Sequence, residues 1–275
     1  MTRAIVLIAL AAAISDLAGT SASRGTPVPR AATIQEADEA QRLAARIRGR
    51  LAESRALLER FGYFEEDTEI QVDRSGVEEK RETRVYAVTP APPGGGPDSR
   101  LVSVDGRAPT SDEREEDDER RADERDDARR ESKDARERRR EAIEDLRRGL
   151  VVRIDGRAAI DGHQTTIVVF EPRPGARLRS RAGLFIRAMR GRLWATSAGD
   201  IVRLEAELVD DVSVGWGLIA RIWKGGWLRA RQQQQGSAWL PFEMTAEAQG
   251  RTLLFRTFRT RYAVRWWGYK LGGSS

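Results

Sequence analysis

The residues with the clearest chemical potential in this 275-residue chain are tryptophans set among cations. All seven tryptophans lie in the last third, interleaved with arginine and lysine: Trp194, Trp216, Trp223, Trp227, Trp239, Trp266 and Trp267. An indole ring beside a cation suits a membrane interface or the mouth of an acyl-chain cavity, because the ring is apolar and its N–H is polar. The alternative is a tryptophan-rich core with solvated arginines.

Side chains for covalent or metal chemistry are sparse. His163 is the only histidine and there is no cysteine, which excludes a Ser–His–Asp triad, a histidine metal cluster and a cysteine nucleophile. Four glutamates could supply a catalytic carboxylate pair, but each falls on the polar side of a strand pattern: Glu171, Glu205, Glu207 and Glu243. We therefore expect a binding protein without cofactor or metal, and not an enzyme.

The N-terminus has the pattern of an export signal. A basic start, an apolar run over residues 4–14 and a small-x-small site at 21–23 follow one another, in the order of a secretory signal peptide. Residues 1–23 are therefore predicted to be a signal peptide, and 24–32 a flexible lead. No later run reaches transmembrane length, and the lack of cysteine rules out a lipidated cysteine anchor. These features predict a periplasmic protein.

Charge is unevenly distributed along the chain. The net charge is +5, but residues 110–148 contain 17 acidic and 13 basic side chains and so carry −4, which leaves +9 on the remainder. A basic surface suits anionic partners such as phospholipid head groups. Because export argues against nucleic acid, the expected partners are lipid or lipoprotein acyl chains and a membrane surface.

Alternation of apolar and charged residues predicts a sheet in the last third of the chain. Within 202–208 the apolar set alternates with the charged set: Val202, Leu204, Ala206 and Leu208 against Arg203, Glu205 and Glu207. This period of two is typical of a strand in a sheet with one buried face. Turn residues at 198–199, 236–237 and 249–250 divide 192–263 into antiparallel strands. An amphipathic helix over 33–61 and a short helix over 180–190 are expected to pack against the sheet.

Residues 110–148 carry the signals of one long charged helix. Thr110 and Glu113 have capping-box spacing, acids fill the first turns, and Arg147 and Arg148 come just before Gly149. The pattern predicts a solvated helix that protrudes from the domain and is held by ion pairs between residues four apart. The alternative is an arm that binds a protein partner.

The C-terminal half has a recognisable order of short motifs. These are Glu171-Pro172-Arg173-Pro174-Gly175, Ser180-Arg181, Gly191-Arg192-Leu193-Trp194, Arg203-Leu204-Glu205-Ala206 and Trp239-Leu240-Pro241. With the N-terminal amphipathic helix, this order resembles the LolA-like outer-membrane lipoprotein-sorting family. The resemblance implies an incomplete antiparallel barrel, closed by helices, that shields the acyl chains of lipoproteins or other lipids. Two features depart from it: the charged segment 110–148, and Ala195-Thr196-Ser197 where an aspartate would follow Trp194.

Together these features predict an α+β fold. It consists of a curved antiparallel sheet (an incomplete β-barrel), an N-terminal packing helix, a short helix closing the open side and a long charged helical insertion. Residues 33–269 would form one domain, with 110–148 as the insertion and 270–275 as a tail.

The predicted function is a non-catalytic carrier or sensor that binds acyl chains in an apolar cavity. The candidate cavity lining is Val85, Val88, Trp194, Leu204, Leu208, Trp227, Phe255 and Phe258. The candidate contacts to anionic head groups are Arg221, Lys224 and Arg229. The alternative is an envelope scaffold whose segment 110–148 binds a protein partner.

Overall fold

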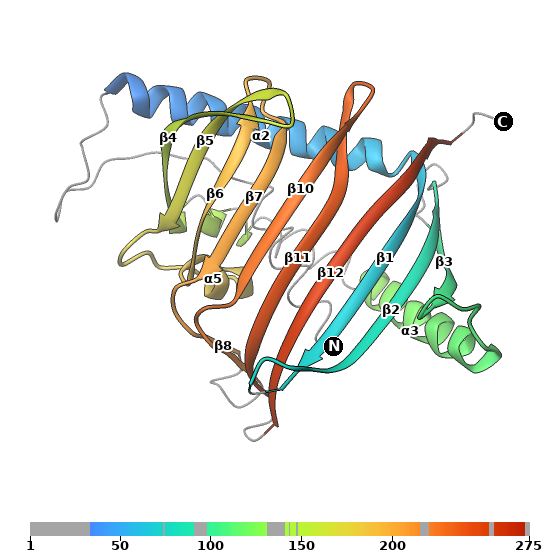
Figure 1. The fold of residues 1–275 in the computed structure, drawn as a ribbon. Coiled ribbons are helices and arrows are strands. Elements are labelled where there is room, and N and C mark those ends of the chain that lie inside the picture. The colour runs from blue at the N-terminus through green and yellow to red at the C-terminus, as the bar shows by residue number, and fades with distance from the viewer. Residues whose placement is uncertain are drawn as a thin grey trace.

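The computed structural model describes residues 34–73, 75–90, 98–130, 141–142, 144–146, 148–214, 220–252 and 256–272. These form one twelve-stranded antiparallel sheet with a few helices (Figure 1). The named helices are α2 (Ile34–Leu58), α3 (Ser111–Arg130) and α5 (Arg181–Ile186). The strands are β1 (Phe61–Val72), β2 (Glu78–Thr89), β3 (Asp98–Val104), β4 (Leu150–Ile160), β5 (His163–Pro172), β6 (Met189–Thr196), β7 (Ile201–Leu208), β8 (Val212–Val214), β9 (Ala220–Ile222), β10 (Trp227–Gln235), β11 (Ala238–Thr252) and β12 (Arg256–Leu271).

The first and last long strands lie side by side in the middle of the sheet. The strand order is β3-β2-β1-β12-β11-β10-β7-β6-β5-β4, and β9, which carries β8, pairs with β11. Strand β1 pairs with β12 from Phe61 opposite Leu271 to Gln71 opposite Thr260. This long-range pairing joins the N-terminal strands β1–β3 to the C-terminal meander (Figure 1).

The predicted fold class is wrong. The described residues form mostly one large antiparallel sheet of twelve strands, and they contain no long charged helical insertion. The alternating pattern continues further than expected, so that β11 has 15 residues and β12 has 16. Helix α3 covers only the first part of 110–148, and residues 131–140 lie outside the described part of the chain. The capping box is present, since the Thr110 N–H donates to Glu113 Oε2 at 2.8 Å and the Glu113 N–H donates to Thr110 Oγ1 at 3.2 Å.

The predicted turn at Gln249–Gly250 is also wrong, because both residues lie inside β11. Gly250 pairs with Ile222 of β9 as well as with Phe258 of β12. A Cβ on Gly250 would lie 2.2 Å from the carbonyl oxygen of Arg221. The glycine therefore permits close approach of β9 to β11 and does not mark a turn.

The two packing helices are shorter than predicted. Helix α2 ends at Leu58, and Phe61 and Gly62 already belong to β1. Helix α5 ends at Ile186, three residues before β6 begins. The Ser180 hydroxyl caps α5 by accepting a hydrogen bond from the Gly183 N–H at 3.0 Å.

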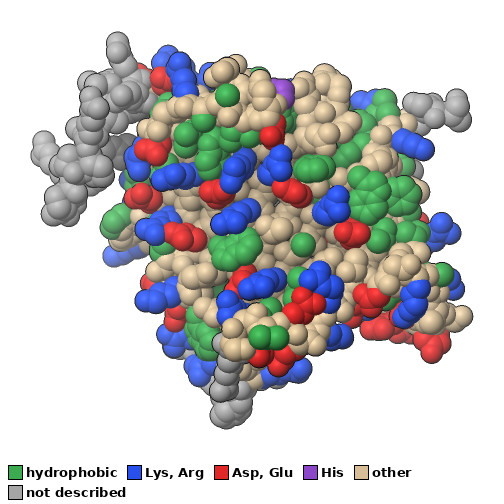
Figure 2. Space-filling model, viewed as in Figure 1, with side chains coloured by type: hydrophobic (Ala, Val, Ile, Leu, Met, Phe, Trp, Pro, Cys, Tyr) green, Lys and Arg blue, Asp and Glu red, His purple; other side chains and the backbone are tan. Residues whose placement is uncertain are grey.

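The sheet has a covered face, against which α2 and α5 pack, and an open face. Residues that are opposite each other on adjacent strands share a face, so the register assigns every position. Leu193 pairs with Leu204 on the covered face, whereas the next residue, Trp194, pairs with Arg203 on the open face. Figure 2 looks onto the open face, where Lys and Arg side chains alternate with Asp and Glu.

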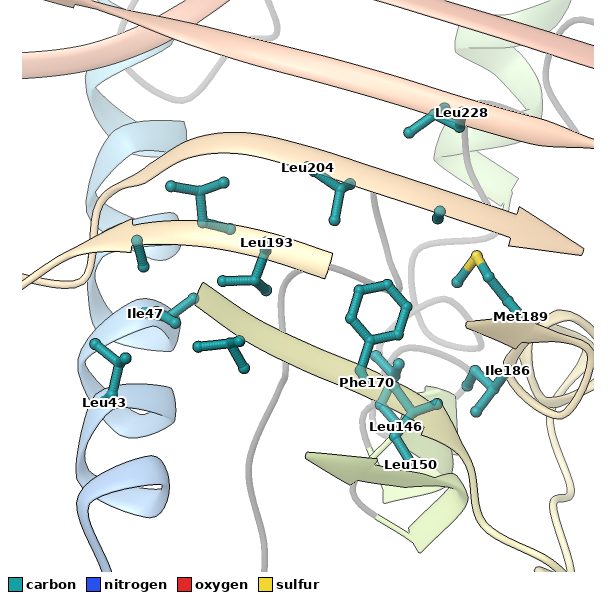
Figure 3. Packing of buried hydrophobic residues seen from close by; sticks show 14 of the residues in the cluster. Leu43, Ile47, Leu146, Leu150, Phe170, Ile186, Met189, Leu193, Leu204 and Leu228 are labelled. Atoms are coloured by element: carbon teal, nitrogen blue, oxygen red, sulfur yellow. The ribbon is translucent and has the colours of Figure 1, made fainter. Parts of the chain in front are cut away.

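The main core lies between α2 and the covered face of the strands β4 to β7, β10 and β11 (Figure 3). Leu43 and Ile47 lie one turn apart on α2 and point into this core. An ion pair between Arg50 Nε and Asp200 Oδ1 at 2.7 Å ties the same helix to the turn between β6 and β7. The core cluster comprises Leu43, Ile47, Leu146, Leu150, Val168, Phe170, Ile186, Met189, Leu193, Ala195, Ile201, Leu204, Ala206, Leu228 and Ala246.

Among the described residues, no helix combines the length and the apolar character needed to cross a bilayer. The predicted signal peptide, 1–23, and the predicted lead, 24–32, lie outside the described residues.

Candidate functional site

The predicted lining residues do not share one face of the sheet. Register places four of them on the covered face, namely Val88, Leu204, Leu208 and Phe258. Three others lie on the open face, namely Val85, Trp194 and Trp227. Phe255 lies outside the described residues. A single cavity on one face therefore cannot contain the whole predicted set.

One half of the covered face is packed solid. Leu204 is 2% exposed and belongs to the main core, where it lies close to Leu193 and Leu228 (Figure 3). Close packing of this kind leaves no volume for a ligand beneath α2.

The other half of the covered face contains a cavity. It has a volume of about 1090 Å³ and lies at the ends of β1, β11 and β12 that are remote from α2. Its lining residues come from β1, β2, β11, β12 and the loop after β9: Glu69, Gln71, Val72, Asp73, Glu79, Trp223, Gln249, Thr252, Arg256, Thr257, Phe258, Arg259, Thr260 and Tyr262.

One wall of the cavity is aromatic and leads into a second apolar cluster. Trp223, Phe258 and Tyr262 line the cavity. Phe258 also packs against a buried cluster made by Phe185, Ala188, Val212, Ile222 and Ala248. Next to that cluster is a small apolar pocket of about 40 Å³, bordered by Leu208 and Trp227. Phe258 therefore joins the aromatic wall of the cavity to a packed apolar cluster that includes Phe185 of α5.

The rim of the cavity is polar and carries both signs of charge. Asp73 caps the turn between β1 and β2, where its carboxylate accepts hydrogen bonds from the Ser75 and Val77 N–H groups at 2.8 Å. A hydrogen bond from the Ser75 hydroxyl is the main cause of the lowered pKa of Asp73, and the backbone hydrogen bonds add to it. Arg259 also lines the cavity, but its guanidinium turns to the open face, where Nε donates to Glu247 Oε1 at 2.7 Å. A bound amphiphile would meet charged groups at this rim and rings further inside.

The predicted head-group contacts are divided between two places. Lys224 directly follows Trp223, which lines the cavity, whereas register with Arg251 places Arg221 on the open face; both residues contact Asp211. The pKa of Asp211 is lowered, first by the hydrogen bond from the Lys224 N–H and then by Arg221. Arg229 also lies on the open face, with its guanidinium 4.9 Å from the centroid of the Trp227 ring.

Sequence reasoning did not identify a partly buried carboxylate group on the covered face, that of Glu65. Trp266 Nε1 donates to Glu65 Oε2 at 2.7 Å. Burial raises the pKa of Glu65 to about 7, and the nearby charge of Asp67 adds to this, while Trp266 and Arg121 act against it. The sequence offered one signal for this contact, namely aromatic residues in two segments far apart in the chain. These segments come together only when β1 pairs with β12.

Helix α3 is docked on the sheet through its charged side chains. Asp117 is 1% exposed and contacts both Arg120 and Arg121, with Arg121 Nε donating to Oδ2 at 2.6 Å. The Tyr86 hydroxyl of β2 donates a hydrogen bond to Asp117 Oδ1 at 3.3 Å. The guanidinium carbon of Arg121 lies 4.6 Å from the centroid of the Tyr86 ring. Burial opposes the charge of Asp117, but the two arginines outweigh it and lower its pKa. This end of α3 therefore lies against the sheet, in contrast to the protruding helix that was predicted.

The single histidine packs against an aromatic ring. The ring centroids of His163 and Trp239 are 4.7 Å apart in an edge-on arrangement. Among the residues that the structure describes, no group of three or more His, Cys, Asp or Glu side chains is placed to hold a metal ion.

Two of the solved structures that match this chain have low similarity to it. A DUF1329 family protein from Desulfovibrio piger has a TM-score of 0.32 and 11% identity, over 88% of this chain and 95% of that chain. An outer membrane lipoprotein-sorting protein domain from Vibrio parahaemolyticus has a TM-score of 0.31 and 10% identity, over 88% of this chain and 94% of that chain. No protein-family model and no curated protein matches the chain. One of these neighbours has the description of the family that the sequence resembles, but at this TM-score the likeness shows neither a shared family nor a shared function.

Proposed function

We propose that this protein is a periplasmic lipid or lipoprotein carrier that holds an acyl chain in the cavity beside β1 and β12. The observation that supports this proposal is the cavity of about 1090 Å³, with its aromatic wall and its charged rim. Sites for small organic ligands commonly have volumes of about 300–1,000 Å³. The periplasmic location rests on the predicted signal peptide.

The proposed binding mode places the hydrocarbon against Phe258 and Tyr262, with its end directed towards Leu208 and the cluster below α5. Burial of each methylene contributes about 0.8 kcal/mol, so a dozen give on the order of 10 kcal/mol before ordering costs. That is sufficient to hold a lipid in water and still release it to a second binding site.

The polar end of the lipid would remain at the rim. Arg256 lines the cavity and is exposed, and Lys224 directly follows Trp223, which also lines it. These cations suit a phosphate or carboxylate head group. Of the predicted lining residues, Phe258 and Leu208 therefore belong to the proposed site, whereas Leu204 belongs to the packed core.

A cavity-filling substitution tests the proposal. Gln71 is an exposed residue on β1 that lines the cavity, so Gln71→Trp adds volume there without removing a core contact. Gln234→Trp, at an exposed position on β10 that does not line the cavity, is the matched control. Binding of a fluorescent fatty acid would be titrated, and native mass spectrometry would detect lipid that copurifies from the host.

The expected result is fatty-acid binding by the wild type and the Gln234 variant, with affinity at least about fivefold lower in the Gln71 variant, because overpacking costs about 1–3 kcal/mol. Lipid-free protein that takes up no fatty acid would contradict the proposal, as would equal binding by both variants.

A further inference from the structure

An exposed aromatic pair lies on the open face, at the end of the two central strands. Phe64 of β1 is opposite Trp267 of β12, and each residue is 41% exposed. Their ring centroids are 5.8 Å apart and the ring planes are inclined by 22°, so the rings are stacked. Figure 2 shows hydrophobic side chains gathered near the right-hand edge of this face, where β1 and β12 lie in Figure 1. Stacking covers one side of each ring and leaves the rest in water.

Exposed cations surround the aromatic pair. Arg265 lies two residues before Trp267, Lys270 lies three residues after it, and Arg100 of β3 is separated from Phe64 by a single strand position, Ala87. Within the described residues, none of these three cations forms an ion pair. We call the five residues Phe64, Arg100, Arg265, Trp267 and Lys270 the aromatic–basic patch.

Elsewhere on the open face, ion pairs between basic and acidic side chains are common. Several arginines of this face form ion pairs with glutamates on neighbouring strands, as in Arg190 with Glu207 and Arg261 with Glu247. Two acids lie opposite Arg265, namely Glu66 on β1 and Glu243 on β11, and Glu243 is itself ion-paired with Arg231 at 3.0 Å. Three cations against Glu66 and the already paired Glu243 leave the patch with a local excess of positive charge.

A bulge in the central strand pair sets the geometry of the two rings. The register of β1 and β12 shifts between Gly62 and Phe64, and Gly268 has a φ of +69°. A Cβ on Gly268 would lie 3.2 Å from Phe64 Cδ2. Glycine therefore supplies both the left-handed backbone and the space that the Phe64 ring occupies. The rings are held by paired strands and not by a loop.

We propose that the aromatic–basic patch docks the protein on the surface of a bilayer that contains anionic lipid. Tryptophan and phenylalanine rings favour the boundary between head groups and acyl chains. Basic side chains beside them are attracted to lipid phosphates within a Debye length. Because rigid strands carry the rings, insertion is shallow, and docking is reversible and sensitive to salt.

Cosedimentation with vesicles tests this docking. The wild type should bind vesicles of phosphatidylglycerol with phosphatidylethanolamine, and bind vesicles of phosphatidylcholine alone much more weakly. The double change Phe64→Ser with Trp267→Ser should lower partitioning at least about tenfold. The double change Arg100→Gln with Lys270→Gln should do the same, because each cation near an anionic surface contributes a factor of about five.

A fluorescence readout locates the contact. Brominated lipid quenches tryptophan only at the bilayer boundary, so Trp267→Phe should retain vesicle binding and lose most of the quenching that the wild type shows. This variant keeps an aromatic ring at the position and removes only the reporter.

Charge-matched and fold controls make the result specific. Arg190→Gln with Arg192→Gln removes two cations from the open face outside the patch and should leave binding within about twofold of wild type. Gln71→Trp in the cavity should also leave it unchanged, since the cavity lies on the other face. If circular dichroism shows that the Phe64→Ser, Trp267→Ser variant does not fold, vesicle binding by the Arg100→Gln, Lys270→Gln variant tests the proposal instead.

Absence of wild-type binding to anionic vesicles would overturn the proposal. Equal losses of vesicle binding in the Arg100→Gln, Lys270→Gln variant and the Arg190→Gln, Arg192→Gln control would also overturn it. Sedimentation equilibrium of the free protein tests the other occupant. A dimer that the patch variants convert to monomer, with no vesicle binding, would assign the patch to a second copy of the chain instead.

Discussion

Trp194 of β6 lies opposite Arg203 of β7 on the open face, and the guanidinium carbon of Arg203 is 5.1 Å from the indole centroid. The neighbouring pair, Leu193 with Leu204, lies on the covered face in the main core. Trp194 is 9% exposed because the arginine covers its ring, which is a cation–π contact and not a ligand pocket. The side-chain alternation of the strand thus places Trp194 on the face opposite the proposed cavity.

From this arrangement we predict that Trp194→Phe leaves fatty-acid affinity within about twofold of wild type, while Phe258→Ala lowers it at least about tenfold. Phe258 lines the cavity and packs on the cluster below α5, so its removal takes away apolar contact with the ligand. Titration of a fluorescent fatty acid measures both effects. A large loss of affinity in the Trp194 variant would show that ligand binds on the open face.

The sequence predicted local patterns well and long-range pairing poorly. Strand β10 ends at Gln235, directly before the predicted turn at 236–237, because the alternation and the turn residues are local signals. The pairing of β1 with β12 depends on residues about two hundred positions apart, and no local pattern specifies it. Glu65 meets Trp266 only through that pairing.

The cavity could not be predicted for a similar reason. Alternation shows which residues share a face, but the position of a cavity depends on where the packing helices end. Leu204 and Phe258 have equivalent patterns in their strands, yet the first lies in the packed core beside α2 and the second lines open space.

We predict that Asp117→Asn loosens α3 from the sheet. The change removes the charge that Arg120 and Arg121 share, and an unpaired buried partner typically costs about 3–5 kcal/mol. Because both arginines are partly exposed, the expected loss is smaller, about 1–3 kcal/mol. Urea unfolding measures the loss, and limited proteolysis within α3 should become faster. Asp118→Asn, at the next and exposed position, is the control and should change stability by less than about 0.5 kcal/mol.

We predict that Gly250→Ala displaces β9 from β11. The new methyl group would lie 2.2 Å from the Arg221 carbonyl oxygen, so the strand that supports Trp223 must move. We expect a loss of about 1–3 kcal/mol in the free energy of unfolding. Fatty-acid affinity should fall in the same variant, because Trp223 lines the cavity.

The control for that variant is another glycine-to-alanine change. Gly49 lies inside α2 with no atom within 4 Å of an added Cβ, so Gly49→Ala should stabilise the protein by about 0.5–1 kcal/mol. Thermal unfolding should shift in opposite directions for the two variants. Equal shifts would mean that β9 tolerates the methyl group.

The last prediction concerns Glu65, whose pKa burial raises from the ordinary value near 4.5 to about 7. Between these two values the folded state binds more protons than the unfolded state, so the free energy of unfolding falls as pH rises through this window and levels off above about 7. Glu65→Gln keeps an acceptor for Trp266 Nε1 and removes the charge. The variant should therefore be about 1–3 kcal/mol more stable than wild type at pH 8 and similar to it below pH 4.5. Urea unfolding at several pH values measures the difference, with Glu119→Gln on the exposed side of α3 as the control. A wild-type stability that rises between pH 5 and 7, with the rise lost in the Gln variant, would mean that Glu65 is charged and paired in the folded protein.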